Sequence, residues 1–180
     1  MKLFTNHLEL IAANLDHVCA ELEAPERLAS LLDVQVEPGW PPGEYDRDAQ
    51  EFFRDRLREG GLDVVGWYGW YAIRRVNPDE PSVLVGAAGY IGPPNDAGEV
   101  EIGFSMMPRW QGLGYATEIC RALVENALAD VCVKKVVAHA SPLNLPSCRV
   151  LEKCGFHRAD VDEETRNKRF EILRGNIPGV

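Results

Sequence analysis

The chain has 180 residues, of which 46% are hydrophobic and 26% charged, and its net charge is −9. This length and balance are typical of one soluble globular domain with a sizeable core, so we expect a single domain over residues 1–180. The negative charge argues against a nucleic-acid partner and favours cationic substrates such as amines.

Other features of the composition bear on location. No apolar run reaches the length of a membrane span, and the start of the chain lacks the apolar core of a signal peptide, so we expect no membrane partner. The five cysteines show no CxxC spacing, which indicates reduced thiols rather than a disulfide framework. Together these features predict a cytoplasmic protein.

The first third of the chain predicts a strand followed by helices. His7–Ala12 is a plausible strand, and Leu15–Leu32 reads as one or two helices broken near Pro25. The segment Glu37–Gly43 is too rich in proline and glycine for regular structure. An amphipathic helix is then predicted over Asp46–Glu59, with apolar residues on one face.

Two strands are predicted next. Gly66–Ile73 is rich in aromatic residues, and Ser82–Ile91 has the continuous apolar run of a central strand. Turn residues at Asn77–Pro81 lie between the two strands, and those at Gly92–Asp96 follow the second.

The segment Glu99–Ala116 carries the strongest signal in the chain. Val100, Ile102 and Phe104 alternate with polar residues or glycine, as in a half-buried strand. The loop that follows contains two glycines and opens a predicted helix over Tyr115–Asp130. Glycines let a backbone approach a ligand closely, and the free N–H groups and positive dipole at the start of a helix bind anions. The sequence therefore predicts a phosphate-bearing ligand at this point.

Three glycine-loop patterns can be compared with this loop. The nucleoside triphosphate pattern G-x-x-x-x-G-K-[ST] requires a lysine that the loop lacks. The dinucleotide pattern G-x-G-x-x-G would place its third glycine where Thr117 stands. The pattern Q/R-x-x-G-x-G/A is matched in full by Gln111, Gly114 and Ala116. The loop thus resembles the pyrophosphate loop of the GNAT N-acetyltransferase superfamily, whose members bind acetyl-CoA.

A second segment, Asn144–Phe156, strengthens this resemblance. Its residues NLPSCRVLEKCGF predict a short helix with an asparagine or serine cap, a proline in the first turn and Gly155 at the end. They also resemble the N-x-x-S-x-x-V-L-E-K-x-G-F signature of the superfamily, and most of all its ribosomal-protein N-terminal acetyltransferases (the RimJ/RimL-like branch). A buried strand over Lys135–Ala140 precedes this helix. A hairpin of Phe156–Asp160 and Lys168–Arg174 is predicted to close the fold.

The order of these elements predicts an α+β fold with a single mixed β-sheet flanked by helices. The resemblance, which covers roughly Leu8–Arg174, adds splayed central strands with acetyl-CoA as cosubstrate between them. It implies that main-chain groups hold the pantetheine arm and the pyrophosphate, with the Met106 amide as the oxyanion donor. The implied cofactor-binding residues are Phe104, Ser105, Met106, Gln111, Gly112, Leu113, Gly114, Tyr115, Ala116 and Asn144.

The catalytic groups of the family map onto this chain with one departure. Many members carry a tyrosine acid where this chain has Leu151, whereas the branch that it resembles has a serine where Ser147 stands. Ser147 is therefore the candidate proton donor, although a serine there is often only a helix cap. Glu99 and Glu101 share one strand face and either could act as the base, with the resemblance favouring Glu101. Other members of the branch use a later carboxylate. Here that later segment holds Asp160, Asp162, Glu163 and Glu164.

The acceptor is predicted from the weakness of the case for a dedicated base. An α-amino group has a pKa of ~7.7–8.0 and a lysine side chain one of ~10.4, so an α-amine needs less help to lose its proton. We therefore expect a protein N-terminal α-amine as acceptor, with a small amine (an antibiotic, a polyamine or an amino acid) as the alternative. The loop around Trp40 is expected to shape the acceptor site.

Two other interpretations of the function stay open at this point. The absence of the tyrosine at Leu151 is compatible with an acetyl-CoA sensor without turnover, and a dinucleotide-binding domain would bind NAD instead. His139 lies on a predicted buried strand and is expected to be a core residue. The histidines show no metal-ligand spacing, so no metal is predicted. The sequence leaves a homodimer open.

Overall fold

The computed structural model describes residues 1–75, 80–161 and 166–175. The turn predicted at Asn77–Pro81 falls largely outside these ranges. Three of the carboxylates considered as bases, Asp162, Glu163 and Glu164, lie outside them entirely. None of the helices in the described part of the chain combines the length and the apolar character needed to cross a bilayer.

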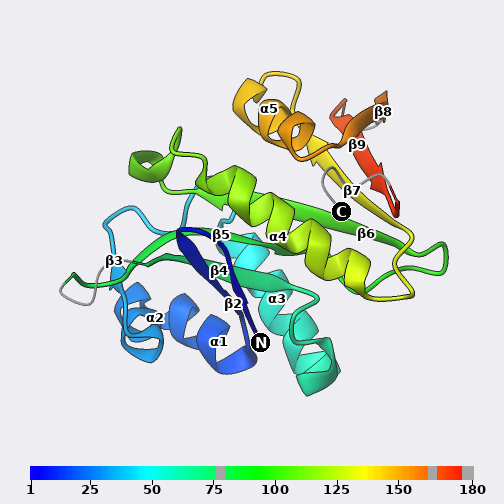
Figure 1. The fold of residues 1–180 in the computed structure, drawn as a ribbon. Helices are drawn as coiled ribbons and strands as arrows, with labels where there is room; N and C mark the ends of the chain where they lie inside the picture. Colours follow the sequence, from blue (N-terminus) through cyan, green and yellow to red (C-terminus); the bar gives the residue numbers. More distant parts are fainter. Residues whose placement is uncertain (76–79, 162–165, 176–180) are drawn as a thin grey trace.

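The fold is a mixed sheet with helices on both faces, which confirms the predicted fold class (Figure 1). The strands are β1 (Lys2–Phe4), β2 (Leu8–Ala12), β3 (Gln35–Val36), β4 (Gly69–Arg74), β5 (Val83–Tyr90), β6 (Glu99–Met106), β7 (Lys135–Ala140), β8 (His157–Val161) and β9 (Lys168–Leu173). The helices are α1 (Leu15–Glu23), α2 (Pro25–Leu32), α3 (Arg47–Gly60), α4 (Tyr115–Ala129) and α5 (Leu145–Lys153), with short 3-10 turns η1 (Gly61–Val64) and η2 (Pro108–Trp110).

Local sequence signals account for several helix boundaries. The predicted break at Pro25 is confirmed, because α1 ends at Glu23, with Ala24 as its C-cap, and the proline opens α2. Asp46 caps α3 by accepting a hydrogen bond from the backbone N–H of Ala49 at 3.0 Å. Asn144 caps α5 in the same way. The short strands β1 and β3 were not predicted, since two or three residues give no readable alternation.

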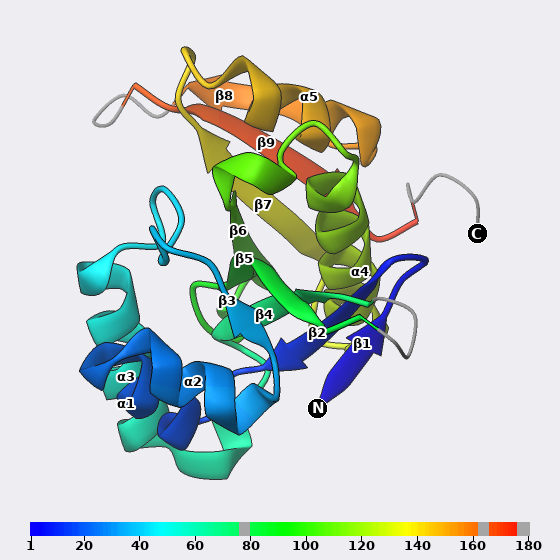
Figure 2. The same cartoon turned by 90° about the vertical axis from the view of Figure 1, so that its left-hand side faces the viewer.

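The strand order is β1-β2-β4-β5-β6-β7-β9-β8, with β3 paired beside β5. Neighbours in this order are antiparallel except for β6 and β7, which run parallel. Helices α1, α2 and α3 lie on one face of the sheet and α4 lies on the other (Figures 1 and 2). Each face has its own hydrophobic core, one centred on α4 and the other beneath α1–α3.

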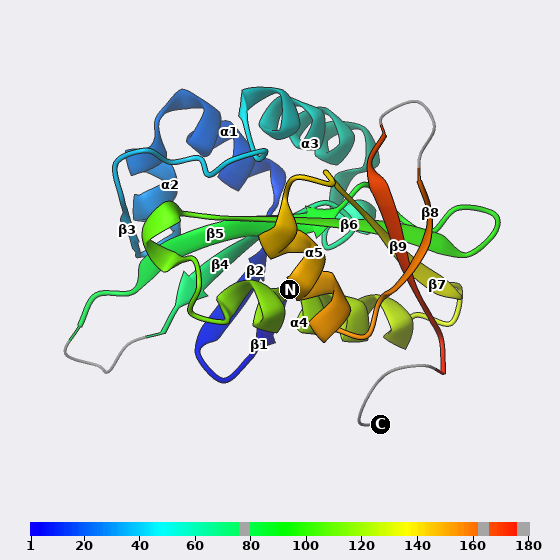
Figure 3. The same ribbon diagram turned by 90° about the horizontal axis from the view of Figure 1, so that it is seen from above.

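The parallel pair β6 and β7 separates partway along its length. The two strands pair only from Glu99 to Glu101 on β6 and from Lys135 to Val137 on β7. Beyond that point β6 pairs with β5 alone and β7 with β9 alone, so the two halves of the sheet diverge (Figure 3). The divergence leaves backbone groups of β6 without a strand partner and opens a space between β6 and β7.

Candidate active site

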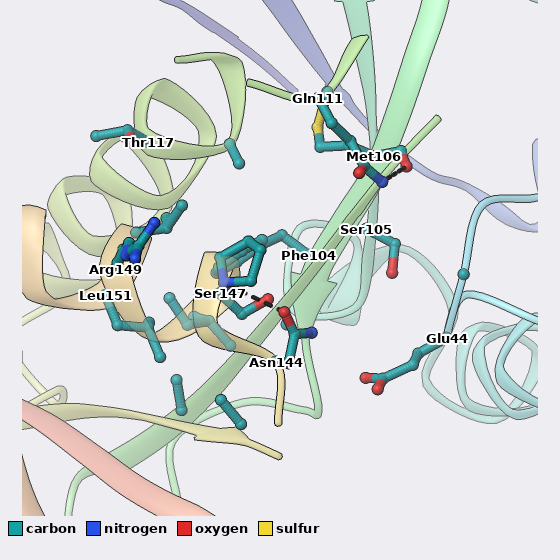
Figure 4. A pocket seen from close by; sticks show the side chains of 18 of the residues that line it. Glu44, Phe104, Ser105, Met106, Gln111, Thr117, Asn144, Ser147, Arg149 and Leu151 are labelled. Carbon is teal, nitrogen blue, oxygen red and sulfur yellow. Dashed lines mark hydrogen bonds between the residues drawn. The ribbon is translucent and has the colours of Figure 1, made fainter. Parts of the chain in front are cut away.

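A cavity of about 730 Å³ lies where β6 and β7 diverge. Its walls come from β6, β7, the glycine loop, the first turns of α4 and α5, and the loop that precedes α3 (Figure 4). Segments that are far apart in the sequence therefore face one space. Most of the residues implied as cofactor-binding by the sequence line this cavity.

The glycine loop offers a row of unpaired backbone donors. The backbone N–H groups of residues 112–116 have no acceptor among the residues that the structure describes. Gly112 and Gly114 have φ values of +76° and +88°, which disfavour any side chain, and a Cβ added at either would meet no atom within 4 Å. The Gln111 side chain braces the loop, since its Nε2 donates to the Met106 carbonyl at 3.1 Å. A loop with free donors and open space fits a phosphate group.

Two cations from α5 line the same cavity, and the sequence reasoning missed both. Arg149 and Lys153 follow the proline-containing first turn of the helix and line the cavity together with Thr117 of α4. Figure 4 shows the Arg149 side chain on the side of the cavity nearest the start of α4. Their spacing of four residues, one helical turn, was the signal that could have found them. Positive charge here complements the row of N–H groups in binding an anion.

The edge of β6 presents backbone groups to the opening. The N–H of Ile91 donates to the carbonyl of Glu101, and the N–H of Met107 donates to that of Val85, so odd-numbered residues of β6 bond to β5. In an antiparallel pair the intervening residues turn their N–H and C=O the other way. Phe104 and Met106 therefore direct backbone groups toward the opening.

The backbone of Ser105 is directed differently. Its carbonyl faces β5, because a Cβ added at Gly86 would lie only 2.6 Å from the Ser105 oxygen. The Ser105 side chain lines the cavity, so this residue reaches the site through its hydroxyl rather than its main chain.

The first turn of α5 places Asn144 and Ser147 on the cavity. Asn144 Oδ1 accepts a hydrogen bond from the Ser147 N–H at 3.1 Å, so the cap of this helix is the asparagine rather than the serine. Ser147 is half-buried and lines the cavity, and its Oγ has no hydrogen-bond partner in the described chain. Leu151 also lines the cavity and is only 1% exposed, so the position of the family's tyrosine is filled by a buried aliphatic group.

The face of β6 that is turned away from α4 carries polar side chains. Glu101, Gly103 and Ser105 alternate with the core residues Ile102 and Met106, so they share the face turned away from α4. A Cβ added at Gly103 would meet nothing within 4 Å, so this face of β6 is open between its two polar neighbours.

The loop before α3 closes this space from the other side. A Cβ added at Gly43 would lie 3.4 Å from Ser105 Oγ, and both Gly43 and Glu44 line the cavity. Figure 4 shows the Glu44 carboxylate and the Ser105 hydroxyl facing the same opening.

The two candidate bases on β6 have different surroundings. Glu99 Oε2 lies 2.7 Å from Arg169 Nη2 and 2.9 Å from Lys135 Nζ. Partial burial raises the pKa of Glu99, but these cations outweigh it and hold the pKa below its usual value. Glu101 Oε1 instead lies 2.8 Å from Nδ1 of His139 on β7. Glu99 is thus held by two cations, whereas Glu101 faces an imidazole.

His139 is not a core residue, contrary to the sequence-based expectation. Its side chain is 22% exposed, and it lines the cavity. Val136, Val137, Ala138 and Ala140 of β7 are buried, which is why the sequence pattern was misleading, but the end of the strand lies against the opening where β6 has diverged.

A buried carboxylate holds the proline-rich loop in place. Glu21 of α1 is 4% exposed, and its Oε1 accepts a hydrogen bond from Trp40 Nε1 at 2.6 Å. Its Oε2 accepts bonds from the hydroxyls of Tyr71 at 2.6 Å and Tyr45 at 2.8 Å. Burial raises the pKa of Glu21, and these three donors, together with Gln50, oppose that rise. The sequence pattern gave no sign of this cluster, in which Trp40 is an anchor of the loop rather than an exposed wall.

Comparison with known proteins identifies the family. The acetyltransferase (GNAT) domain family matches residues 13–157, so the chain belongs to this family and is an N-acetyltransferase. The Bacillus subtilis (strain 168) protein YjdG, described as an uncharacterized N-acetyltransferase, is 27% identical over 154 residues, which cover 86% of this chain and 88% of that protein. The predicted family membership is therefore confirmed, and GNAT enzymes use an acyl-CoA and an amine acceptor.

Two solved structures illustrate the range of the fold. Mycobacterium smegmatis RimJ in complex with CoA-disulfide superimposes with a TM-score of 0.61 at 15% identity, over 95% of this chain and 84% of that one. The aminoglycoside acetyltransferase AAC(6')-Ib, in complex with coenzyme A, gives 0.57 at 21% identity, over 93% and 95% of the two chains. At these identities the likeness concerns the fold alone.

Proposed function

We propose that this N-acetyltransferase moves an acetyl group from acetyl-CoA to a protein N-terminal α-amine by direct attack of the amine. The observation that carries the proposal is the run of five N–H groups at residues 112–116, which have no acceptor in the described part of the chain and lie at the cavity between the diverging strands. We take the chain as one acetyltransferase domain. Its five free cysteines favour the cytoplasm as its location.

The residues of the cavity fit the cosubstrate part by part. The backbone of Gln111, Gly112, Leu113, Gly114, Tyr115 and Ala116 would hold the pyrophosphate. Arg149 and Lys153 would add charge-assisted contacts to phosphate oxygens. Backbone groups of Phe104 and Met106 would pair with the pantetheine arm, joined by the Ser105 hydroxyl and the Asn144 side chain. The cosubstrate supplies the activated acetyl group as a thioester.

The same strand would stabilise the charge that develops during transfer. The Met106 N–H is directed into the opening, where it would donate to the acetyl oxygen as negative charge builds on it. Such a donor typically contributes ~10²–10³ in rate. Because this donor is a backbone group, substitution of the Met106 side chain would leave it in place.

Two side chains would handle the protons. Ser147 would protonate the leaving sulfur, since its Oγ faces the cavity without another partner in the described residues. Glu101, rather than Glu99, would assist proton loss from the acceptor amine, directly or through a neighbouring group, because Glu99 is already held by Arg169 and Lys135. An α-amine has a pKa of ~7.7–8.0 and so needs only modest help from such a base. This is one reason to prefer an α-amine over a lysine side chain, and the resemblance of Asn144–Phe156 to the RimJ/RimL-like signature is the other.

A small cationic amine is the second candidate acceptor. Glu44 places a carboxylate on the acceptor side of the cavity, and no described residue pairs with it. A free carboxylate there would attract an acceptor that carries a second positive charge. The aminoglycoside acetyltransferase among the structural neighbours is compatible with this alternative.

Acetyl transfer to a defined panel tests the proposal. The wild-type protein is incubated with acetyl-CoA and hexapeptides that have free N-termini, the same peptides with blocked N-termini, spermidine, kanamycin and free amino acids, and products are read by mass. We expect a mass increase of one acetyl group on the free peptides only. Acetylation of spermidine or kanamycin alone would establish the second candidate. Binding of acetyl-CoA without any product would favour the sensor interpretation.

A further inference from the structure

We propose that His139 is the group that takes the proton from the acceptor amine, and that Glu101 acts through His139 as a positioning residue. This inference rests on the proposed function and refines it. It replaces a carboxylate base with an imidazole that a carboxylate orients. It also assigns a catalytic role to a residue that the sequence analysis set aside as core.

The first observation is the contact between the two side chains. His139 Nδ1 lies 2.8 Å from Glu101 Oε1, across the two strands at the point where they begin to diverge. A carboxylate accepts hydrogen bonds but cannot donate them, so Nδ1 must carry the proton. In the neutral ring Nε2 then keeps its lone pair, which is the form that can accept a proton. The contact therefore selects one tautomer and fixes the plane of the ring.

The second observation is which of the two side chains reaches the cavity. His139 lines the cavity, and Glu101 is absent from its lining. In the described chain, Nε2 of His139 has no hydrogen-bond partner, so the nitrogen that bears the lone pair is free. Glu101 has already committed one oxygen to the imidazole. An amine in the cavity would therefore meet the imidazole before the carboxylate.

The third observation is the open space beside the imidazole. Gly103 follows Glu101 by two residues on the same strand face, and His139 follows Val137, the last residue of β7 that pairs with β6, by two. A Cβ on Gly103 would meet nothing within 4 Å. The missing side chain leaves room for an acceptor beside His139, within reach of the opening where the acetyl group would lie.

The cations near Glu101 and His139 are paired with other carboxylates. Arg169 is the cross-strand partner of His139 on β9, but its Nη2 is held by Glu99 at 2.7 Å. Lys135 is bound by Glu99 and Glu171. Arg169 and Lys135 are thus neutralised by other carboxylates, which leaves the Glu101 carboxylate to the imidazole of His139.

The proton balance of the step is complete with these groups. The amine nitrogen forms a C–N bond with the acetyl carbon, its proton passes to His139 Nε2, and the C–S bond breaks with the electron pair leaving on sulfur. The sulfur takes a proton from Ser147 Oγ, which recovers one from water, and His139 releases its proton to water. The net products are the amide and the free thiol.

A double-mutant cycle tests this assignment. His139→Asn keeps a side-chain N–H for Glu101 but removes Nε2, and Glu101→Gln keeps an acceptor for the ring but removes the charge. With an acceptor from the panel, we expect His139→Asn to lower kcat about 10²–10³-fold at unchanged acetyl-CoA affinity. Glu101→Gln should lower kcat less, and should add nothing in the His139→Asn background. His157→Asn, at an exposed histidine on β8 that also contacts a carboxylate, is the matched control and should keep full activity.

Either of two kinetic results would overturn the inference. Full activity of His139→Asn would remove the imidazole from the reaction. Equal losses from Glu101→Gln in the wild-type and His139→Asn backgrounds would make Glu101 an independent base. In both cases the wild type still acetylates its acceptor, so the proposed function survives. If the wild type acetylates nothing in the panel, the proposed function fails instead.

A measurement without substrate tests the tautomer directly. The chain has four histidines, so a long-range ¹H–¹⁵N spectrum of their rings can be assigned with the His139→Asn variant. We expect the proton of neutral His139 on Nδ1 in the wild type, and a shift toward the other tautomer in Glu101→Gln. A proton on Nε2 in the wild type would contradict the proposed orientation of the ring.

Discussion

Replacement of Glu21 by glutamine should weaken both the fold and acceptor binding. The carboxylate accepts from Trp40 Nε1 with one oxygen, and from the Tyr71 and Tyr45 hydroxyls with the other. Glutamine has one acceptor oxygen, and its second terminal atom is a donor. If the oxygen serves the tyrosines, the amide nitrogen faces the Trp40 N–H, and that buried donor loses its acceptor.

The size of the effect follows from three contributions. A buried donor without a partner costs about 1–3 kcal/mol, and hydrogen bonds to a charged group lose part of their strength when the charge is removed. Relief of the desolvation of the buried carboxylate, which raises the pKa of Glu21, offsets part of this loss. We expect a net destabilisation of about 2 kcal/mol, which for a domain of this size lowers Tm by about 4–8 °C.

Calorimetric melting and acceptor kinetics measure the two consequences. Glu125→Gln, at an exposed position of α4, removes the same charge without a buried partner and should melt like the wild type. Glu21 holds the loop that carries Gly43 and Glu44 to the proposed acceptor side, so KM for the acceptor should rise while acetyl-CoA affinity stays the same. A Tm within 1 °C of the control, or an equal loss of acetyl-CoA affinity, would refute this reasoning.

The same variant gives a pH prediction. Burial raises the pKa of Glu21 above its usual value of 4.5, so the folded chain binds a proton at a pH where the unfolded chain does not. Stability from this group therefore increases as pH falls through the raised pKa toward about 4.5. The difference in Tm between the wild type and Glu21→Gln should widen over that interval. A difference that narrows as pH falls would contradict the direction of the shift.

Three further substitutions test separate walls of the site. Gly114→Val forces a β-branched residue to a φ of +88° in the phosphate loop, and should abolish acetyl-CoA binding in calorimetry while circular dichroism shows an intact fold; retained affinity would exclude the loop assignment. Ser147→Ala should lower kcat about 10²-fold at unchanged acetyl-CoA affinity, and an unchanged kcat would rule out its role as proton donor. Gly103→Leu puts a side chain into open space on the acceptor face, so acceptor turnover should fall while acetyl-CoA still binds; an unaltered KM and kcat would place the acceptor elsewhere.

Local sequence patterns were sufficient to predict the fold class, and they pointed to the glycine loop and to the helix start at Asn144 that line the cavity. The alternation in β6, the glycines of the loop and the caps of α5 are all signals contained within a few residues. The resemblance to a family then supplied the ligand. The short strands β1 and β3 escaped prediction because their pairing, rather than their own residues, defines them.

The proposed acceptor side of the cavity depends on contacts that no local pattern records. Glu101 and His139 are 38 residues apart and meet only because β6 and β7 run parallel before they diverge. Glu21 gathers donors that lie 19, 24 and 50 residues away. No motif or spacing in the local sequence distinguishes these side chains, because their contacts are made with residues that are distant in the sequence.

Calorimetric titration of the folded wild-type protein with acetyl-CoA, with NAD as the control ligand, tests the central claim most directly. The account predicts micromolar binding of acetyl-CoA and no heat with NAD, because the N–H groups of residues 112–116 and the opening beside β6 fit a pyrophosphate that carries a pantetheine arm. No binding of acetyl-CoA by protein whose fold is verified would contradict the account, and would reduce the glycine loop to a simple turn.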